Sequence, residues 1–149
     1  MEKLKTGDSL FDKNLIDAQQ AICPFCTLEM ETNSHILFTC HFWWCIWMKI
    51  LEWWGISGVL QNRCDSFTLA WRGLLSNGKR GKLWSLILGC VIWSLWYERN
   101  KVKFKDRAPN PHKLFQTLKI RVGIWAKEML GFDAFPSHVI SHNIDALLR

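Results

Sequence analysis

Residues 23–40 read CPFCTLEMETNSHILFTC and place four potential metal ligands within a short segment: Cys23, Cys26, His35 and Cys40, in the spacing C-x2-C-x8-H-x4-C. The two residues between the first two cysteines let the backbone turn, so that both thiolates can face one point. His35 and Cys40 are separated by slightly more than one helical turn, so both can reach the same ion. Cys thiolates and His nitrogens in a tetrahedron are the usual ligands of structural zinc. The pattern therefore predicts one structural Zn2+ ion.

Two other interpretations of this cluster stay open from the sequence. Cys23 and Cys26 could form a redox pair without His35, although the βαβ pattern of thioredoxin-like motifs is absent. His41 could replace Cys40 as the fourth ligand. Four protein ligands leave no open coordination position, which favours a structural over a catalytic ion. The remaining cysteines lie in apolar surroundings and are expected to be small buried residues: Cys45, Cys64 and Cys90.

Apolar residues after the cluster recur at three- and four-residue steps, which is the period of an α-helix. Gly55 and Gly131 are expected to end helices, and Pro109 breaks the chain between two of them. No alternating strand pattern stands out, so we predict a mainly α fold, with a small zinc-bound lobe followed by about four helices. The predicted helices cover residues 35–54, 67–75, 82–104 and 112–130, with a further short one at 14–21.

The length of 149 residues and the hydrophobic content of 49% fit one domain with a packed core. Residues 1–22 form an N-terminal lead-in. The predicted zinc-binding domain covers residues 23–130, with the zinc cluster at 23–40 and the helical part at 41–130. The tail, residues 131–149, has no firm pattern and is expected to be partly disordered.

Ten tryptophans are present, most of them at helical spacing. On one helix face they are expected to form an aromatic core. The alternative is that some stack on unpaired bases, because an aromatic face accepts any base. Neighbouring pairs cannot all point inward, so we expect Trp44, or one of Trp53 and Trp54, to be exposed.

Positive charge is concentrated late in the chain. Residues 99–127 carry nine basic and one acidic side chain, a balance of +8 that exceeds the net charge of +6 for the whole chain. Such a stretch favours a polyanionic partner, RNA or DNA first. The alternatives are a solvated linker before Pro109, or a structural role in which Arg99 and Asn100 anchor the helix end. The candidate phosphate-binding residues are Arg99, Lys101, Lys103, Lys105 and Arg107.

Several classes of protein are disfavoured. The chain starts with charged residues and no apolar signal segment follows, so we expect an intracellular, reducing compartment, with nucleus and cytoplasm not distinguished. The longest uncharged stretch, Leu83 to Tyr97, is shorter than the roughly 20 residues of a membrane span, so no membrane partner is expected. Without a nucleophile elbow, a phosphate-binding glycine loop or an acidic cluster, no enzymatic activity is expected.

Residues around the cluster carry a family resemblance. Residues 4–10 read Leu-Lys-Thr-Gly-Asp-Ser-Leu, and residues 92–100 read Ile-Trp-Ser-Leu-Trp-Tyr-Glu-Arg-Asn, with Phe104 beyond them. Together with Glu31 and Trp47, these segments resemble the zinc-binding domain (zf-RVT type) that follows the reverse transcriptase in plant LINE-type, or non-LTR, retrotransposons. The likeness covers about residues 4–104 and is weaker to residue 130.

The resemblance implies a non-catalytic zinc-binding module that engages nucleic acid during copying of the element, with a reverse transcriptase polypeptide as a possible partner. A polymerase, endonuclease or ribonuclease H region does not fit in 149 residues. Two rival hypotheses therefore remain. The chain could be a structural or protein-interaction module, whose tryptophan-rich surface docks onto a polymerase, or a fragment of an element without a function of its own.

Overall fold

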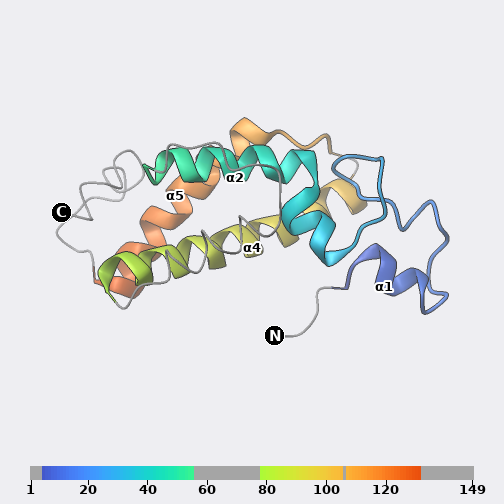
Figure 1. Ribbon diagram of the computed structural model, residues 1–149, viewed down its shortest axis with the longest axis horizontal. Coiled ribbons are helices and arrows are strands. Elements are labelled where there is room, and N and C mark those ends of the chain that lie inside the picture. Colours follow the sequence, from blue (N-terminus) through green and yellow to red (C-terminus); the bar gives the residue numbers. More distant parts are fainter. Residues whose placement is uncertain (1–4, 56–77, 106, 132–149) are drawn as a thin grey trace.

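The computed structural model describes residues 5–55, 78–105 and 107–131, and most of these residues are helical (Figure 1). The only β feature among them is an isolated antiparallel bridge between Ile22 and Met30. The predicted mainly α fold is therefore confirmed. The helix predicted at 67–75 and the tail lie outside the described residues. The elements are α1 (Gly7–Phe11), the π-helical turn η1 (His35–Thr39), α2 (His41–Trp53), α4 (Lys79–Lys105) and α5 (Pro111–Leu130).

The helix predicted over residues 35–54 is interrupted at Cys40. This residue is extended, with φ −63° and ψ 122°, and it separates η1 from α2. Its backbone N–H still donates to the carbonyl of His35 at 2.8 Å, which closes the wide turn before the chain changes direction. A periodic apolar pattern is not altered by one extended residue, so the break was not visible in the sequence.

The two long helices agree with the predictions. Helix α4 begins three residues before the predicted start, at Lys79. Helix α5 has Pro111 in its first turn, and the Asn110 side chain accepts a hydrogen bond from the Lys113 N–H at 2.9 Å. This is a side-chain N-cap, with proline where its missing N–H costs nothing. Gly131 ends the helix in the left-handed conformation, with φ 67°.

The short helix predicted at residues 14–21 is wrong, because this segment forms successive turns. The Asp17 carboxylate accepts a hydrogen bond from the Gln20 N–H at 2.7 Å, the contact of an N-cap, so a new turn begins at residue 17, inside the predicted helix. The carbonyl of Ala21 accepts from the Glu31 N–H at 2.8 Å, which places the end of the segment beside the Cys/His loop. A short helix forms earlier instead, at Gly7–Phe11.

The core lies between α2, α4 and α5, and four tryptophans are fully buried in it: Trp43, Trp47, Trp54 and Trp84. The rings of Trp54 and Trp84 join α2 to α4 with centroids 5.0 Å apart. The predicted aromatic core is confirmed for these four. Trp44 and Trp53 are half-buried, whereas Trp44, or one of Trp53 and Trp54, was expected to be exposed. Trp93 and Trp96, on α4, are exposed.

The N-terminal lobe, made of α1, the Cys/His loop and η1, sits at one end of the helical body (Figure 1). Trp47 ties it to α2, because its indole N–H donates to the carbonyl of Leu37 at 2.7 Å. None of the helices in the described segments has the length and apolar character needed to cross a bilayer.

Gly7 packs closely against the backbone of Ala21, just before the Cys/His loop. A Cβ atom at this position would lie 2.6 Å from the backbone oxygen of Ala21, well inside van der Waals contact. Since the obstructing atoms are backbone, they cannot rotate away as a flexible side chain would. A side chain at position 7 therefore requires the two segments to separate.

We predict that Gly7→Ala destabilises the protein by about 1–3 kcal/mol, the usual effect of overpacking. Gly89→Ala is the matched control, because a Cβ there meets nothing within 4 Å and alanine favours a helix interior. It should stabilise α4 by up to about 1 kcal/mol. Urea denaturation measures both variants, and equal stability for the two would contradict the packing at Gly7.

Candidate metal centre

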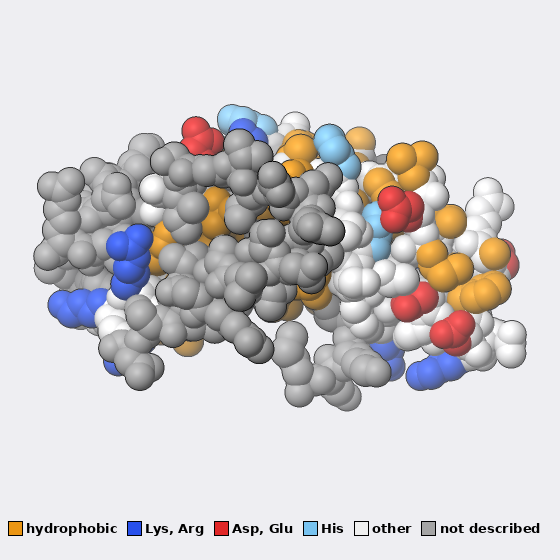
Figure 2. Space-filling model, in the orientation of Figure 1, with side chains coloured by type: hydrophobic (Ala, Val, Ile, Leu, Met, Phe, Trp, Pro, Cys, Tyr) orange, Lys and Arg blue, Asp and Glu red, His pale blue; other side chains and the backbone are white. Residues whose placement is uncertain are grey.

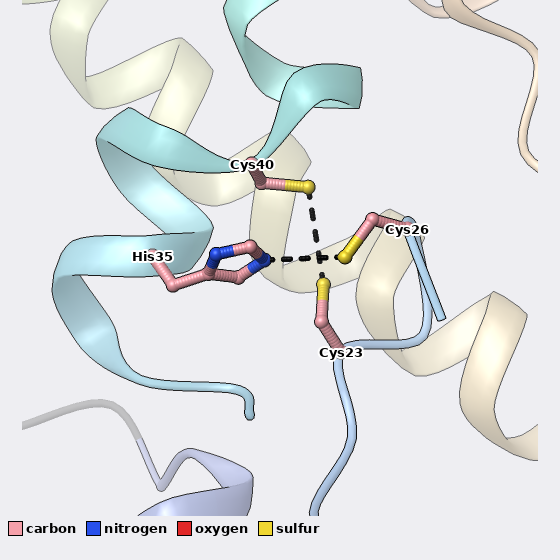
Figure 3. A group of neighbouring side chains, drawn as sticks. All are labelled: Cys23, Cys26, His35 and Cys40. Carbon is pink, nitrogen blue, oxygen red and sulfur yellow. Dashed lines mark hydrogen bonds between the residues drawn. The ribbon is translucent and has the colours of Figure 1, made fainter. Parts of the chain in front are cut away.

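The side chains of Cys23, Cys26, His35 and Cys40 converge on one point (Figure 3). One ligand atom from each lies within 4.8 Å of all the others, so the group could hold a metal ion. The Sγ atoms of Cys23 and Cys40 are 3.9 Å apart, and Cys26 Sγ is 3.3 Å from His35 Nε2. Because Cys23, His35 and Cys40 are buried, these donor atoms are largely withdrawn from water.

The first two cysteines are positioned by a tight loop. The carbonyl of Cys23 accepts from the Thr27 N–H at 2.9 Å, and the Cys23 N–H donates to the carbonyl of Glu29 at 2.8 Å. Thr27 has φ 57°, a left-handed conformation that is uncommon for a β-branched residue. The chain reverses there, which returns the loop toward its own start and holds Cys26 beside Cys23.

The His35 ring is oriented by contacts on both of its nitrogens. Nε2 faces the cysteine sulfurs, whereas Nδ1 lies 3.1 Å from Glu29 Oε2 and 3.3 Å from Thr39 Oγ1. A metal-bound histidine usually has a carboxylate or another polar group on its second nitrogen, which fixes the tautomer and the ring plane. The environment of His35 therefore suits a ligand that binds through Nε2.

The two buried thiols affect one another's ionisation. The hydrogen bond with Cys40, followed by burial, raises the pKa of Cys23 far above its ordinary value. The same hydrogen bond lowers the pKa of Cys40. Both sulfurs point at the same position, so ionisation of one opposes ionisation of the other. A divalent cation at that position would stabilise both thiolates.

The other candidate ligands lie away from the centre. His41 is exposed and does not belong to the group of four donors, which contains Cys40 instead. Cys90 is buried in the core, where burial raises its pKa to about 12, and Cys45 is half-buried. The prediction that these cysteines are buried is thus confirmed for Cys90 and only partly met at Cys45. Cys64 lies outside the described residues.

A buried carboxylate, that of Glu31, connects the Cys/His loop to the rest of the fold. Glu31 has an exposed fraction of 0%, and its two oxygens accept from Arg99 Nε at 2.7 Å and from Arg99 Nη2 at 2.9 Å. Oε2 also accepts from the Gly7 N–H at 2.9 Å, and Lys103 Nζ lies 3.5 Å from it. Glu31 therefore connects the Cys/His loop, the lead-in and α4. This role of Glu31 could not be predicted from the sequence, because its partner Arg99 lies 68 positions away.

The five basic residues predicted to bind phosphates divide into separate groups, because α4 continues through Lys105 and spreads them around its surface. Arg99 is buried against Glu31, which agrees with the anchoring role considered for it. Lys103 donates to the carbonyl of Gln20 at 2.9 Å, on the same side. Lys101 pairs with Glu98 at 3.2 Å. Lys105 and Arg107 are exposed, and neither has an ion pair among the described residues.

No protein-family model, curated protein or solved structure matches this chain. The resemblance to the reverse transcriptase zinc-binding domain therefore stays a prediction from the sequence motifs. The case for the candidate centre is the local geometry described above.

We predict that Arg99→Met destabilises the protein by about 3–5 kcal/mol, because it leaves the Glu31 carboxylate buried without its main partner. Lys105→Met, which removes an exposed charge, should change stability by less than about 0.5 kcal/mol. Urea denaturation compares the two variants. The double variant Glu31→Met/Arg99→Met should recover part of the loss, since it buries no unpaired charge. An Arg99→Met protein as stable as the Lys105→Met protein would contradict this account.

Proposed function

We propose that this chain is a non-catalytic zinc-binding module that binds RNA or DNA through basic side chains on its helical part. The observation that carries the metal assignment is the convergence of three cysteine sulfurs and one histidine nitrogen within 4.8 Å. Tetrahedral zinc with the usual bond lengths separates two sulfurs by about 3.8 Å, and a sulfur from a nitrogen by about 3.6 Å. The sulfur–sulfur distance of 3.9 Å and the sulfur–nitrogen distance of 3.3 Å are close to these values.

The ligand set supports a structural role for the ion. Three thiolates and one imidazole complete a tetrahedron, which leaves no position for a substrate or a reactive water. The ion would connect the loop of Cys23 and Cys26 to the junction between η1 and α2 at Cys40. Glu31 lies in the loop between the second and third ligands, so the same ion would fix its carboxylate against Arg99. In this proposal, zinc holds the lobe in the conformation that meets α4.

The nucleic-acid part of the proposal is supported by unpaired positive charge. Lys105, Arg107 and Lys113 are exposed, and none has an ion pair within the described segments. They lie at the end of α4 and the start of α5, in the stretch with a charge balance of +8. Exposed cations of this kind attract phosphates without regard to base sequence and release counterions when they bind.

A protein-docking function has one observation in its favour. Large apolar side chains of the N-terminal lobe are exposed, among them Phe11, Leu15, Leu28 and Met30. Hydrophobic side chains gather at this end of the molecule together with acidic ones (Figure 2). Such a surface suits a protein partner better than a polyanion. The two functions would use different residues, so nucleic-acid binding that is absent or independent of salt would favour docking.

We predict about one zinc ion per chain by elemental analysis of protein purified without added chelator. Cys26→Ser should lose most of the metal, whereas Cys45→Ser, outside the cluster, should keep it. Removing the metal with a chelator should reduce the circular dichroism signal at 222 nm, because binding of a structural ion contributes directly to folding. Stoichiometric zinc in the Cys26→Ser protein would refute the ligand assignment.

We predict that a fluorescent single-stranded RNA or DNA binds the zinc-loaded protein in 50 mM salt, measured by anisotropy. For three to four phosphate contacts, raising the salt to 200 mM should weaken binding about 20- to 50-fold, since each contact releases counterions. Binding that is absent in 50 mM salt, or unchanged by salt, would refute nucleic-acid binding by these cations.

A further inference from the structure

A cavity of about 390 Å3 is lined by the C-terminal part of α4, the segment that connects it to α5 and the first half of α5. Among the residues that the structure describes, four cationic side chains and one carboxylate line it. The cations come from both helices and from the turn: Lys101, Arg107, Lys113 and Arg121, with Glu98 as the carboxylate.

We propose that this cavity binds backbone phosphates of single-stranded nucleic acid. The inference rests on the proposed function and names its site. That site differs from the linear basic stretch, because Arg99 and Lys103 are turned toward Glu31 and two cations of α5 take part.

Arg121 is held in place by neighbouring groups. Its Nη1 donates a hydrogen bond to the hydroxyl of Ser94, a buried residue of α4. Its guanidinium lies 4.2 Å from the ring centre of Trp93. With one N–H and one ring contact used, further N–H groups of the guanidinium remain as donors to phosphate oxygens. A cation fixed before binding loses less conformational entropy when the ligand arrives.

An aromatic pair extends this arrangement along α4. Trp93 and Tyr97 are stacked with ring centres 5.1 Å apart and planes 15° apart. Lys101 Nζ lies 4.1 Å from the ring centre of Tyr97, a cation–π contact. Two of the four cations therefore rest against aromatic rings, which fixes their positions beside the cavity. The rings already stack on each other and contact these cations, so they are less available to stack on a base. This arrangement favours binding of phosphate by the cations.

The remaining two cations supply charge without compensation. Arg107 and Lys113 are exposed and have no acidic partner among the described residues. Asn110, which also lines the cavity, caps α5, so the positive end of that helix dipole faces the same region. Glu98, the carboxylate in the described lining, is already paired with Lys101 at 3.2 Å. The described part of the lining thus has an excess of positive charge suited to more than one phosphate.

The test compares two charge-reversed proteins that carry the same change in net charge. Arg107→Glu/Lys113→Glu alters the cavity. Lys79→Glu/Lys127→Glu alters the far ends of the same two helices, at side chains that also lack ion pairs among the described residues. Binding of a fluorescent single-stranded oligonucleotide is measured over a salt titration, and thermal unfolding confirms that both variants fold.

The cavity variant should bind at least about tenfold more weakly, and its salt slope should fall by about one to two, the effect of losing one or two phosphate contacts. The control should stay within about threefold of the wild type. If both variants bind equally weakly, or if the cavity variant is not weakened, the cavity is not the binding site. Either result would leave the proposal of nucleic-acid binding itself intact. A wild-type protein that binds no oligonucleotide would instead refute the proposed function.

Two further measurements separate recognition of phosphate from recognition of bases. An abasic oligonucleotide should bind within about threefold of the normal one if the backbone is the ligand. Arg121→Lys keeps the charge but loses the planar donor group, and should weaken binding several-fold without lowering the unfolding temperature substantially. Loss of binding by the abasic strand would overturn the inference, as would unchanged binding by a folded Arg121→Lys protein.

Discussion

The buried carboxylate of Glu31 is the contact on which the arrangement of this fold depends. It accepts hydrogen bonds from the backbone of Gly7 and from the guanidinium of Arg99. The backbone of Glu31 also donates to Ala21 and accepts from Asp8. An ion withdrawn from water must recover its lost hydration through good geometry, and here each oxygen has at least one donor. One side chain therefore fixes the lead-in, the loop and α4 relative to one another.

The candidate metal centre and this carboxylate share the same short loop. Cys26 precedes Glu31, and His35 follows it. An ion bound by both ligands would restrict the backbone on either side of Glu31, and the ion pair with Arg99 restricts the loop from the side of α4. An ion there and the ion pair with Arg99 would thus support each other, because each would limit the freedom of the eight-residue connection between Cys26 and His35, residues 27–34. Such coupling is expected where a small lobe has little apolar core of its own.

The sequence predicted those features that depend on local spacing. The four donors were found from their intervals, and α4 and α5 from their apolar period, since both patterns are set by neighbours a few residues away. The contact between Glu31 and Arg99 joins residues 68 positions apart, which no spacing rule relates. The break at Cys40 depends on one backbone torsion. Similarly, the turns at residues 14–21 form because polar side chains and the pairing of Ala21 prevail over helix propensity.

A run of charge along a sequence is an unreliable guide to a charged surface when the run is helical. Residues four positions apart share a face of a helix, so Arg99 and Lys103 turn together toward Glu31, whereas Lys101 faces the side that carries α5. Two cations of the run thus neutralise a buried carboxylate, and the lost charge is replaced by Lys113 and Arg121 from the next helix. Since each helix supplies only part of the cavity, its charge depends on the packing of α4 against α5. Arg121 contributes both to this packing and to the charge of the cavity. It connects the helices through Ser94 and Trp93, and it lines the cavity. A change that separates the helices would therefore disperse the cations without altering the net charge of the chain.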